Sequence, residues 1–200
     1  MINLEIFLFT LFIILSISLI VLVAYYMHKH YKRQRHNQIC QKVINNFVKR
    51  KPESLYYEDD DEINILNSDS HVESLFDPKS TYDFYCSLGK NVDNQIHYYF
   101  KVIDNRSKHD ITIYDRYNIY RRTRNNHKKK IRNIQSFIDF VPEKPHYVKV
   151  LIINPNASAI LKYHNVGEFH IVDYFHRLYG IHIIPLEKII TDSELLEEIR

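Results

Sequence analysis

The feature that most constrains this chain is an uncharged apolar segment near its N-terminus, IFLFTLFIILSISLIVLVAYYM, which runs from Ile6 to Met27. Its 22 residues would form a helix about 33 Å long, enough to cross a hydrocarbon core of about 30 Å. Its few hydroxyl groups can bond back to the helix, and Tyr25 and Tyr26 stand at one end, where an aromatic belt belongs. The segment therefore predicts a transmembrane helix.

A cleaved signal peptide is the other interpretation of this segment. Signal peptides begin with basic residues and end in a small-residue cleavage site. The preceding stretch, MINLE, contains no Lys or Arg, and no such site follows. Basic residues come only afterwards, in HKHYKRQR at 28–35. Because positive flanks stay in the cytoplasm, we expect residues 1–5 outside the cell membrane, a single pass over 6–27, and the remainder in the cytoplasm.

The segment from residue 28 to residue 74 changes its charge along its length. The first part is basic and carries apolar residues at Ile39, Val43 and Phe47, which predicts a helix with a narrow apolar stripe. Such a helix can lie against anionic lipid, or it can act as a stalk or a self-association seam. The acidic run Glu58–Glu62 then predicts a solvated tether.

A cytoplasmic domain, residues 75–200, follows the tether. We predict strands where aromatic, β-branched or continuous apolar runs occur, at His97–Ile103, Phe137–Val141, Val148–Ile153 and Ile181–Leu186. We predict helices at 77–89, at 166–180 and after a capping box at Thr191–Glu194, whereas Ile111–Tyr120 fits either state. The last two strands should be buried, parallel neighbours. The fold class is therefore a small α/β domain with a mixed sheet flanked by helices.

Composition excludes several functional classes. The chain has three glycines and neither a G-x-x-x-x-G-K-[ST] nor a G-x-G-x-x-G motif, which argues against P-loop and Rossmann phosphate binding. Its two cysteines, Cys40 and Cys86, form no C-x-x-C pair and predict free thiols in a reducing compartment. The histidines form no H-E-x-x-H motif or Cys/His finger, and no G-x-S-x-G elbow is present. We therefore expect no metal site and no small-molecule cofactor.

A second basic region, RRTRNNHKKKIR at residues 121–132, holds seven basic residues in twelve and no acid. The flanking aromatic residues Tyr114, Tyr117, Tyr120 and Phe137 could stack on bases. The region therefore predicts a phosphate-binding surface for nucleic acid. A solvated loop, or contact with an anionic membrane leaflet, explains the same charges. The candidate binding residues are Arg121, Arg122, Arg124, Lys128, Lys129, Lys130 and Arg132.

The order of these stretches is similar to that of the PD-(D/E)xK restriction-endonuclease-like superfamily. STYDFYCSL, YYFKVID, the basic run with SFIDFV, VLIINPNAS and DYFHRLYGIHIIPL resemble a bacterial domain of unknown function in that superfamily. Members of that family often carry an N-terminal membrane helix and a basic linker, and the resemblance spans Leu75 to Ile189. It implies nuclease chemistry, in which an Asp at one strand end and an acid-x-Lys on the next strand hold a divalent metal that activates water.

Mapped onto this sequence, the resemblance implies a degenerate catalytic set. Asp139, in FIDFV, matches the first Asp, but the acid of the next strand falls at about Ile153 and its third residue at about Pro155. Neither can bind a metal or move a proton. A lone Asp at a strand end is more often a turn acceptor than a ligand, so we interpret Asp139 as a vestige. The other possibility is an acid from elsewhere, for which the candidates are Asp83, Asp173 and Glu168.

The sequence thus predicts a single-pass membrane protein with a cytoplasmic, nuclease-like domain that lacks catalysis. It would act as a tethered binding module, with nucleic acid or an unidentified protein as its partner beside the lipid bilayer. Two alternatives stay open. One is an active nuclease with a rearranged site and Mg²⁺ as cofactor. The other is a structural membrane adaptor whose basic loop contacts lipid or protein.

Overall fold

A computed structural model of the chain describes residues 2–49, 63–67, 81–88, 96–104, 110–122, 125, 127–132, 134–142, 146–154, 157–192 and 195–199. Its contacts divide the chain into two compact units, residues 1–36 and 37–200. The predicted acidic tether lies outside the described residues.

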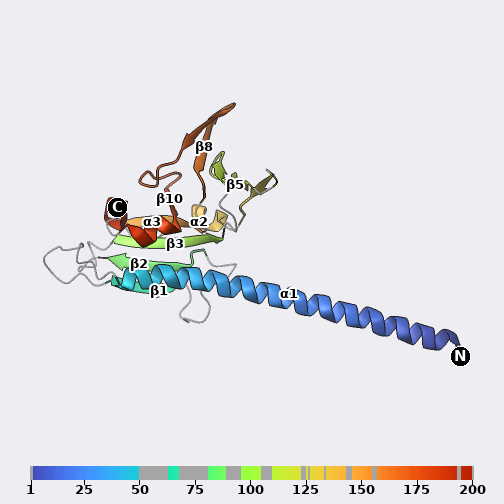
Figure 1. Ribbon diagram of the computed structural model, residues 1–200. Coiled ribbons are helices and arrows are strands. Elements are labelled where there is room, and N and C mark those ends of the chain that lie inside the picture. Colours follow the sequence, from blue (N-terminus) through green and yellow to red (C-terminus); the bar gives the residue numbers. More distant parts are fainter. Residues whose placement is uncertain are drawn as a thin grey trace. The chain divides into compact units, whose positions relative to one another are not determined.

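The first unit is the N-terminal part of helix α1, which spans Ile2–Lys49 (Figure 1). Large apolar side chains between Ile6 and Met27 are at least 40% exposed, as expected for side chains that need lipid rather than protein around them. As predicted, the hydroxyl groups bond to their own helix, at 2.8–2.9 Å from carbonyl oxygens of the preceding turn. This helix is long and apolar enough to cross a membrane, although a signal sequence near an N-terminus has the same properties.

The second unit contains two five-stranded sheets. The first sheet has the order β1-β2-β3-β7-β10, with bounds Ile63–Asn67, Phe84–Leu88, Ile96–Asp104, Tyr147–Asn154 and Ile181–Pro185 (Figure 1). β1, β2 and β3 pair antiparallel, whereas β3, β7 and β10 run parallel. Three predicted strands and the parallel pairing of the last two are therefore confirmed. Strand β1 was not predicted and lies within residues 28–74, the predicted linker.

The first sheet is buried on both faces at its interior strand β7, which lies between β3 and β10. Val150 and Ile152 pack into one core cluster, while Leu151 and Ile153 pack into another. The short helices of this unit are α2 (Gln135–Asp139), α3 (Leu186–Thr191) and α4 (Leu195–Glu198). The first cluster includes residues of α3, α4 and the C-terminal part of α1, and the second includes residues of α2 and of the second sheet. The chain is thus a mixed α/β protein.

The second sheet has the order β6-β5-β4-β8-β9, with bounds Lys128–Lys130, Ile119–Arg122, Ile111–Ile113, Ile160–Asn165 and Glu168–Ile171 (Figure 1). β4 and β8 are parallel, and the other pairs are antiparallel. Isoleucines at the base of this sheet, among them Ile111 and Ile160, join the second core cluster. All of β6 and β9 is exposed. The ambiguous stretch 111–120 resolves into two strands joined by a turn.

The predicted helix at 77–89 is wrong where the structure describes it, because residues 84–88 form strand β2. Phe84 is fully buried, and its ring stacks on Phe100 of β3 with 4.6 Å between centroids. The next residue, Tyr85, packs against the core cluster of the opposite face. This alternation suits a strand and not a helix. The predicted N-cap at Asp77 lies outside the described residues.

The predicted strand at 137–141 is also wrong, because residues 135–139 form helix α2. Phe137 and Ile138 are both buried in the second cluster, whereas a strand would place neighbours on opposite faces. Lys149 Nζ of β7 donates to the carbonyl oxygens of Ile138 and Phe140 at 2.8 and 2.9 Å. It thereby satisfies carbonyl groups at the C-terminal end of α2.

The predicted helix at 166–180 is wrong as well, because Glu168–Ile171 forms strand β9. Gly167 has a φ of +84°, which suits the tight turn between β8 and β9. Ile171 is 79% exposed, so the apolar periodicity that predicted the helix does not mark a buried face. Gly180 has a φ of +77° in the turn before β10 and does not cap a helix.

The apolar stripe predicted after the N-terminal apolar segment belongs in part to the core of the second unit. Ile39, Cys40 and Val43 of α1 are buried in the first core cluster with residues of the first sheet. These three side chains therefore pack on protein, and neither lipid contact nor self-association describes them. The predicted final short helix is present as α4, although residues 193–194 of its capping box lie outside the described residues.

Candidate functional site

The basic residues predicted to bind phosphate lie mostly on one hairpin of the second sheet. Six of the seven are described, namely Arg121 and Arg122 on β5, Lys128, Lys129 and Lys130 on β6, and Arg132 just after β6. Arg124 lies outside the described residues. Because cross-strand partners share a face, Arg122, Lys128 and Lys130 lie on one side of the sheet. Arg121 and Lys129 lie on the other side.

Four aromatic rings gather on the side that carries Lys128 and Lys130. We call them the aromatic face; they are Tyr114, Tyr120, Tyr163 and Phe169. Tyr114 is central, because its ring centroid lies 5.6, 5.2 and 6.3 Å from those of Tyr120, Tyr163 and Phe169. The tyrosines are partly exposed, and Phe169 is 40% exposed. The aromatic face therefore joins residues of β5, β8 and β9 around the turn that follows β4.

Two exposed lysines border the aromatic face. Lys128 Nζ donates to the hydroxyl group of Tyr114 and lies 4.7 Å from the centroid of its ring. Lys130 Nζ donates to Asn118 Oδ1 at 2.9 Å. Within the described residues, both lysines hydrogen-bond to neutral groups, and the charge of Lys130 also helps to lower the pKa of the nearby Asp115 carboxylate. Arg122 is different, because its guanidinium lies 3.9 Å from a carboxylate oxygen of Asp110.

The turn between β4 and β5 is held by Asp115. Its carboxylate accepts bonds from the backbone N–H groups of Tyr117 and Asn118, at 2.7 and 2.9 Å, and from Asn118 Nδ2 at 2.7 Å. These bonds, led by that of the Asn118 side chain, lower the pKa of Asp115. The turn thereby fixes Asn118, the partner of Lys130, and keeps Tyr114 and Tyr120 together.

The sequence identified half of the aromatic face. Tyr114 and Tyr120 were predicted, but Phe137 is wrong as a stacking residue because it is fully buried in the second core cluster. Tyr117 is 52% exposed in the turn, and its described ring contact is with Arg116. Tyr163 lies on β8, a stretch for which no element was predicted, and Phe169 lies on β9, where a helix was predicted. The two residues face each other across the hairpin whose turn contains Gly167, so predicting a turn at this glycine would have indicated that they pair.

Asp139, the predicted vestigial catalytic residue, lies at the end of helix α2 rather than at a strand end. Its carboxylate lies 3.0 Å from Arg116 Nη2 and accepts a bond from Gln135 Nε2 at 3.0 Å. Among the described residues, no further pair of His, Cys, Asp or Glu side chains joins it in a cluster suited to a metal ion. Ile153 is buried in the core, and Pro155 lies outside the described residues.

Asp83, one of the alternative acids, is part of a buried ion pair on the first sheet. It directly precedes β2, and the register of β2 and β3 places it opposite Lys101. Lys101 Nζ donates to Asp83 Oδ1 at 3.1 Å, and the N–H of Val102 donates to Asp83 Oδ2 at 2.7 Å. The other two acids are exposed: Asp173 accepts from the N–H of Phe175 in a turn, and Glu168 lies on β9.

Tyr99 lies two residues before Lys101 on the same face of β3. Its ring contacts the rings of Tyr82, Tyr85 and Phe140, with centroids 5.1–5.2 Å apart. Burial, followed by the nearby Tyr85 and Tyr82, raises the pKa of Tyr99 to about 12. Its phenol therefore stays protonated near neutral pH.

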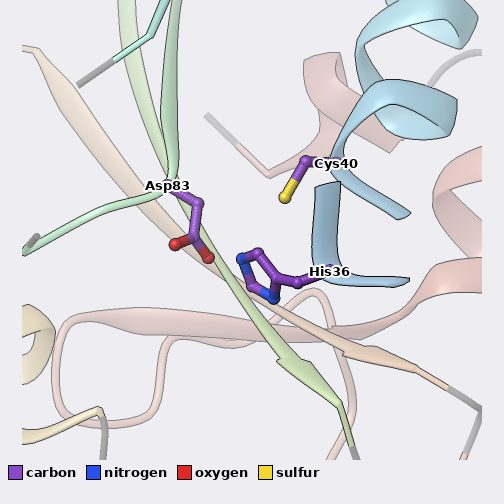
Figure 2. Close-up of side chains that lie close together, drawn as sticks. All are labelled: His36, Cys40 and Asp83. Carbon is purple, nitrogen blue, oxygen red and sulfur yellow. The ribbon is translucent and has the colours of Figure 1, made fainter. Parts of the chain in front are cut away.

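Figure 2 shows Asp83 with the Cys40 thiol and with His36, which lies one helical turn before Cys40 on α1. Within the described part of the chain, these buried residues form the single group of three whose ligand atoms lie within 4.8 Å of one another. The Asp83 carboxylate already accepts bonds from Lys101 and from a backbone amide. A metal ion at this group would have to share the carboxylate with the ammonium group of Lys101.

In comparisons with known proteins, no family model, no curated protein and no solved structure matches this chain.

Proposed function

We propose that this protein is a membrane-anchored binding module whose aromatic face, bordered by Lys128 and Lys130, binds nucleic acid. The observation that carries the proposal is the arrangement of partly exposed tyrosine rings, the exposed ring of Phe169 and exposed cations on one side of the second sheet. Lysine side chains bind phosphate, and aromatic rings stack on bases. A solvated loop would need no such cluster of rings beside its charges.

We propose that the chain is related to the restriction-endonuclease-like superfamily, with other residues at the positions of the catalytic motif than the sequence alone indicated. That chemistry needs an Asp at one strand end and an acid-x-Lys on the next strand. Asp83 stands at the start of β2, and Lys101 lies opposite it on β3. The acid position of the acid-x-Lys sequence is then Tyr99. We therefore propose Asp83 and Lys101, rather than Asp139, as the remnant of a catalytic motif.

The same assignment supports the absence of catalysis. Two carboxylates are needed to hold a catalytic Mg²⁺ in this superfamily, and Tyr99 replaces one of them with a protonated phenol. The remaining carboxylate is bonded to Lys101 and Val102. The pair then acts as a structural ion pair within the first sheet, and the domain binds without cutting.

The location that we propose is the cell membrane, with the N-terminus outside and the second unit in the cytoplasm. Basic residues follow the apolar segment and none precede it, which supports this orientation. A reporter fused to the C-terminus would test it, because the reporter should be protected from protease added outside intact cells.

Binding is tested best with the full-length chain in nanodiscs of phosphatidylcholine, a lipid without net charge. We expect labelled DNA or RNA to bind with an affinity that falls steeply with salt. The double variant Lys128→Gln/Lys130→Gln should weaken binding and reduce the slope of log K against log salt by about 0.7–0.9 per lost phosphate contact. Unchanged binding by this variant would contradict the proposal.

The matched control is the double variant Lys162→Gln/Lys188→Gln. Both lysines are exposed and, like Lys128, lie over a tyrosine ring, at 5.9 and 5.7 Å from the centroids of Tyr179 and Tyr174. Neither contacts a ring of the aromatic face. The control removes the same charge, so it should leave most of the affinity intact.

The buried Asp83–Lys101 pair is the observation that favours the alternative function, a metal-dependent nuclease. That function predicts cleavage of DNA by the full-length chain in the presence of Mg²⁺, and loss of cleavage in Asp83→Asn. We expect no cleavage by either protein.

A further inference from the structure

Building on the proposed nucleic-acid binding, we infer that the aromatic face selects single-stranded over double-stranded nucleic acid, with unpaired bases stacking on Tyr114, Tyr163 and Phe169. The rings form a continuous contact across adjoining strands of the second sheet, and both lysines lie at one border of this contact. A strand laid over the sheet could thus place its bases on the rings and its phosphates at the lysines.

Duplex nucleic acid would not use the rings. In a duplex the faces of the bases are covered by neighbouring bases, so a protein meets only phosphates, sugars and base edges. Lysines alone would suffice for that contact. Single strands expose base faces, and stacking on aromatic side chains tolerates every base because each has a π-face. The mixture of rings and cations therefore suits a single strand of little sequence preference.

An anionic bilayer surface is the other polyanion that lysines and aromatic residues bind. Membrane insertion requires apolar side chains that project from the protein. The rings of Tyr114, Tyr120 and Tyr163 are only partly exposed, and Tyr114 is held against Tyr120 and Tyr163 and by the Lys128 bond to its hydroxyl group. Tyr114 and Tyr163 are inclined by 35° to each other, whereas Phe169 stands edge-on to both rings. Tyrosine rings that are held against one another and only partly exposed project little from the sheet, which favours bases over lipid.

The test compares an oligothymidylate with a duplex of equal length, using the full-length chain in phosphatidylcholine nanodiscs and fluorescence anisotropy. We expect the single strand to bind more tightly at equal salt. Phe169→Ala and Tyr163→Ala should each weaken single-strand binding roughly 5- to 150-fold, the range given by stacking of about 1–3 kcal/mol per base. Neither variant should change duplex binding by more than about twofold, because duplexes meet only the lysines.

Two further variants separate stacking from other effects. Tyr163→Phe keeps the ring and should retain single-strand affinity. If the effect of Tyr163→Ala came from loss of folding or of a hydroxyl hydrogen bond, Tyr163→Phe would lose affinity as well. Tyr117→Ala removes an exposed tyrosine of the same sheet that makes no described contact with the aromatic face, and it should also leave binding unchanged. Circular dichroism melts of each variant check that the second unit stays folded.

The outcomes distinguish this inference from the proposed function. If the single strand and the duplex bind equally and the ring variants change nothing, while Lys128→Gln/Lys130→Gln weakens both, nucleic-acid binding through the lysines stands, and stacking on the rings and single-strand selection are refuted. If neither nucleic acid binds, both proposals fail. If nucleic acid does not bind but nanodiscs containing phosphatidylserine change the exposure of Tyr163 and Phe169 to a quencher, the face is a lipid contact and both proposals are again overturned.

Discussion

The two sheets of the second unit both contain lysine and tyrosine, but in the first sheet the lysine is buried in an ion pair and in the second it is exposed. In the first sheet, Lys101 is buried against Asp83, with Nζ to Oδ1 at 3.1 Å and Tyr99 nearby in sequence on the same face. In the second sheet, Lys128 is exposed and bonds to the neutral Tyr114. A charge that an internal partner neutralises can only support the fold, whereas a charge left at the surface can meet a ligand. This difference is the basis for our proposal that the first sheet is scaffold and the second a binding surface.

Burial explains why the sheets diverge. β7 of the first sheet has core clusters on both faces, so each of its side chains has a structural role. Only the base of the second sheet joins a core, through residues such as Ile111 and Ile160. Its outer strands β6 and β9 are exposed and are free to vary in chemistry without loss of the fold. The same substitution should therefore lower the free energy of unfolding much more in the first sheet than at an exposed position of the second unit.

The largest difference is expected between two aspartates with similar ion-pair distances. Asp83 and Lys101 are 1% and 8% exposed at 3.1 Å, whereas Asp139 and Arg116 are 47% and 43% exposed at 3.0 Å. Asp83→Ala leaves a buried ammonium group without its counterion, so we expect a loss of about 3–5 kcal/mol in unfolding free energy. Asp139→Ala should cost less than about 1 kcal/mol, because water screens the exposed pair. Denaturant titration of the full-length chain in micelles measures both.

The origin of this effect can be checked by removing both charges. The double variant Asp83→Leu/Lys101→Met replaces the buried pair by apolar side chains and should regain most of the stability that Asp83→Ala loses. A double variant as unstable as Asp83→Ala would show that packing or the bond from Val102, rather than the unpaired charge, governs the loss.

A second contrast concerns two isoleucines. Ile152 of β7 is fully buried in the first core cluster, whereas Ile171 of β9 is 79% exposed. Ile152→Ala leaves a cavity and should lower the unfolding free energy by about 2–5 kcal/mol. Ile171→Ala should change it by no more than about 0.5 kcal/mol. A large loss in Ile171→Ala would mean that β9 is covered in the intact protein, and the interpretation of the second sheet as an open surface would be wrong.

The same division explains which elements the sequence could predict. Val148–Ile153 was predicted correctly because an unbroken apolar run suits a strand covered on both faces, whatever covers it. Residues 84–88 were mistaken for helix because their state depends on pairing with β3, which the local pattern does not contain. Likewise α2 depends on Lys149, which bonds to its last carbonyl groups from another element.

The candidate site divides in the same way. Its cations were visible as a basic run, because charge is a local property of the sequence. Its rings were only half visible, because Tyr163 and Phe169 reach Tyr114 through the parallel pairing of β4 with β8. The Asp83–Lys101 pair was likewise missed as a unit, since it depends on the antiparallel register of β2 and β3. Local sequence patterns therefore indicated which residue types a site could contain, whereas the strand pairing determines which of these residues are in contact.

A smaller effect is expected on the pH dependence of stability, through a histidine of the first sheet. His182 of β10 is buried; Nδ1 donates to the carbonyl oxygen of Tyr174 at 3.0 Å, and Nε2 accepts from Arg177 Nε at 3.3 Å. Burial, above all, lowers the pKa of His182 from its ordinary value of 6.5, and Arg177 and His176 lower it further. The unfolded chain therefore binds a proton at higher pH than the folded chain does. Stability contributed by neutral His182 is present above about pH 6.5 and is lost as the pH falls through the folded pKa.

Thermal melts between about pH 7 and about pH 5 measure this contribution. We expect the melting temperature of the full-length chain to fall over this range, and the fall to be smaller in His182→Asn, which cannot titrate. His176→Asn is the control, because this exposed histidine should leave most of the fall in place. An equal fall in His182→Asn would place the acid-sensitive group elsewhere.

The smallest expected effect is confined to the second sheet. Asp115 holds the turn between β4 and β5 through bonds to Tyr117 and Asn118. Its lowered pKa means that this contribution is present above the ordinary value of 3.8 and is lost only as the pH falls through the folded pKa. Asp115→Ala should thus speed hydrogen exchange of the Tyr117 and Asn118 amides near neutral pH, while exchange in β7 stays unchanged. Faster exchange in β7 as well would mean that the two sheets unfold together as one cooperative unit.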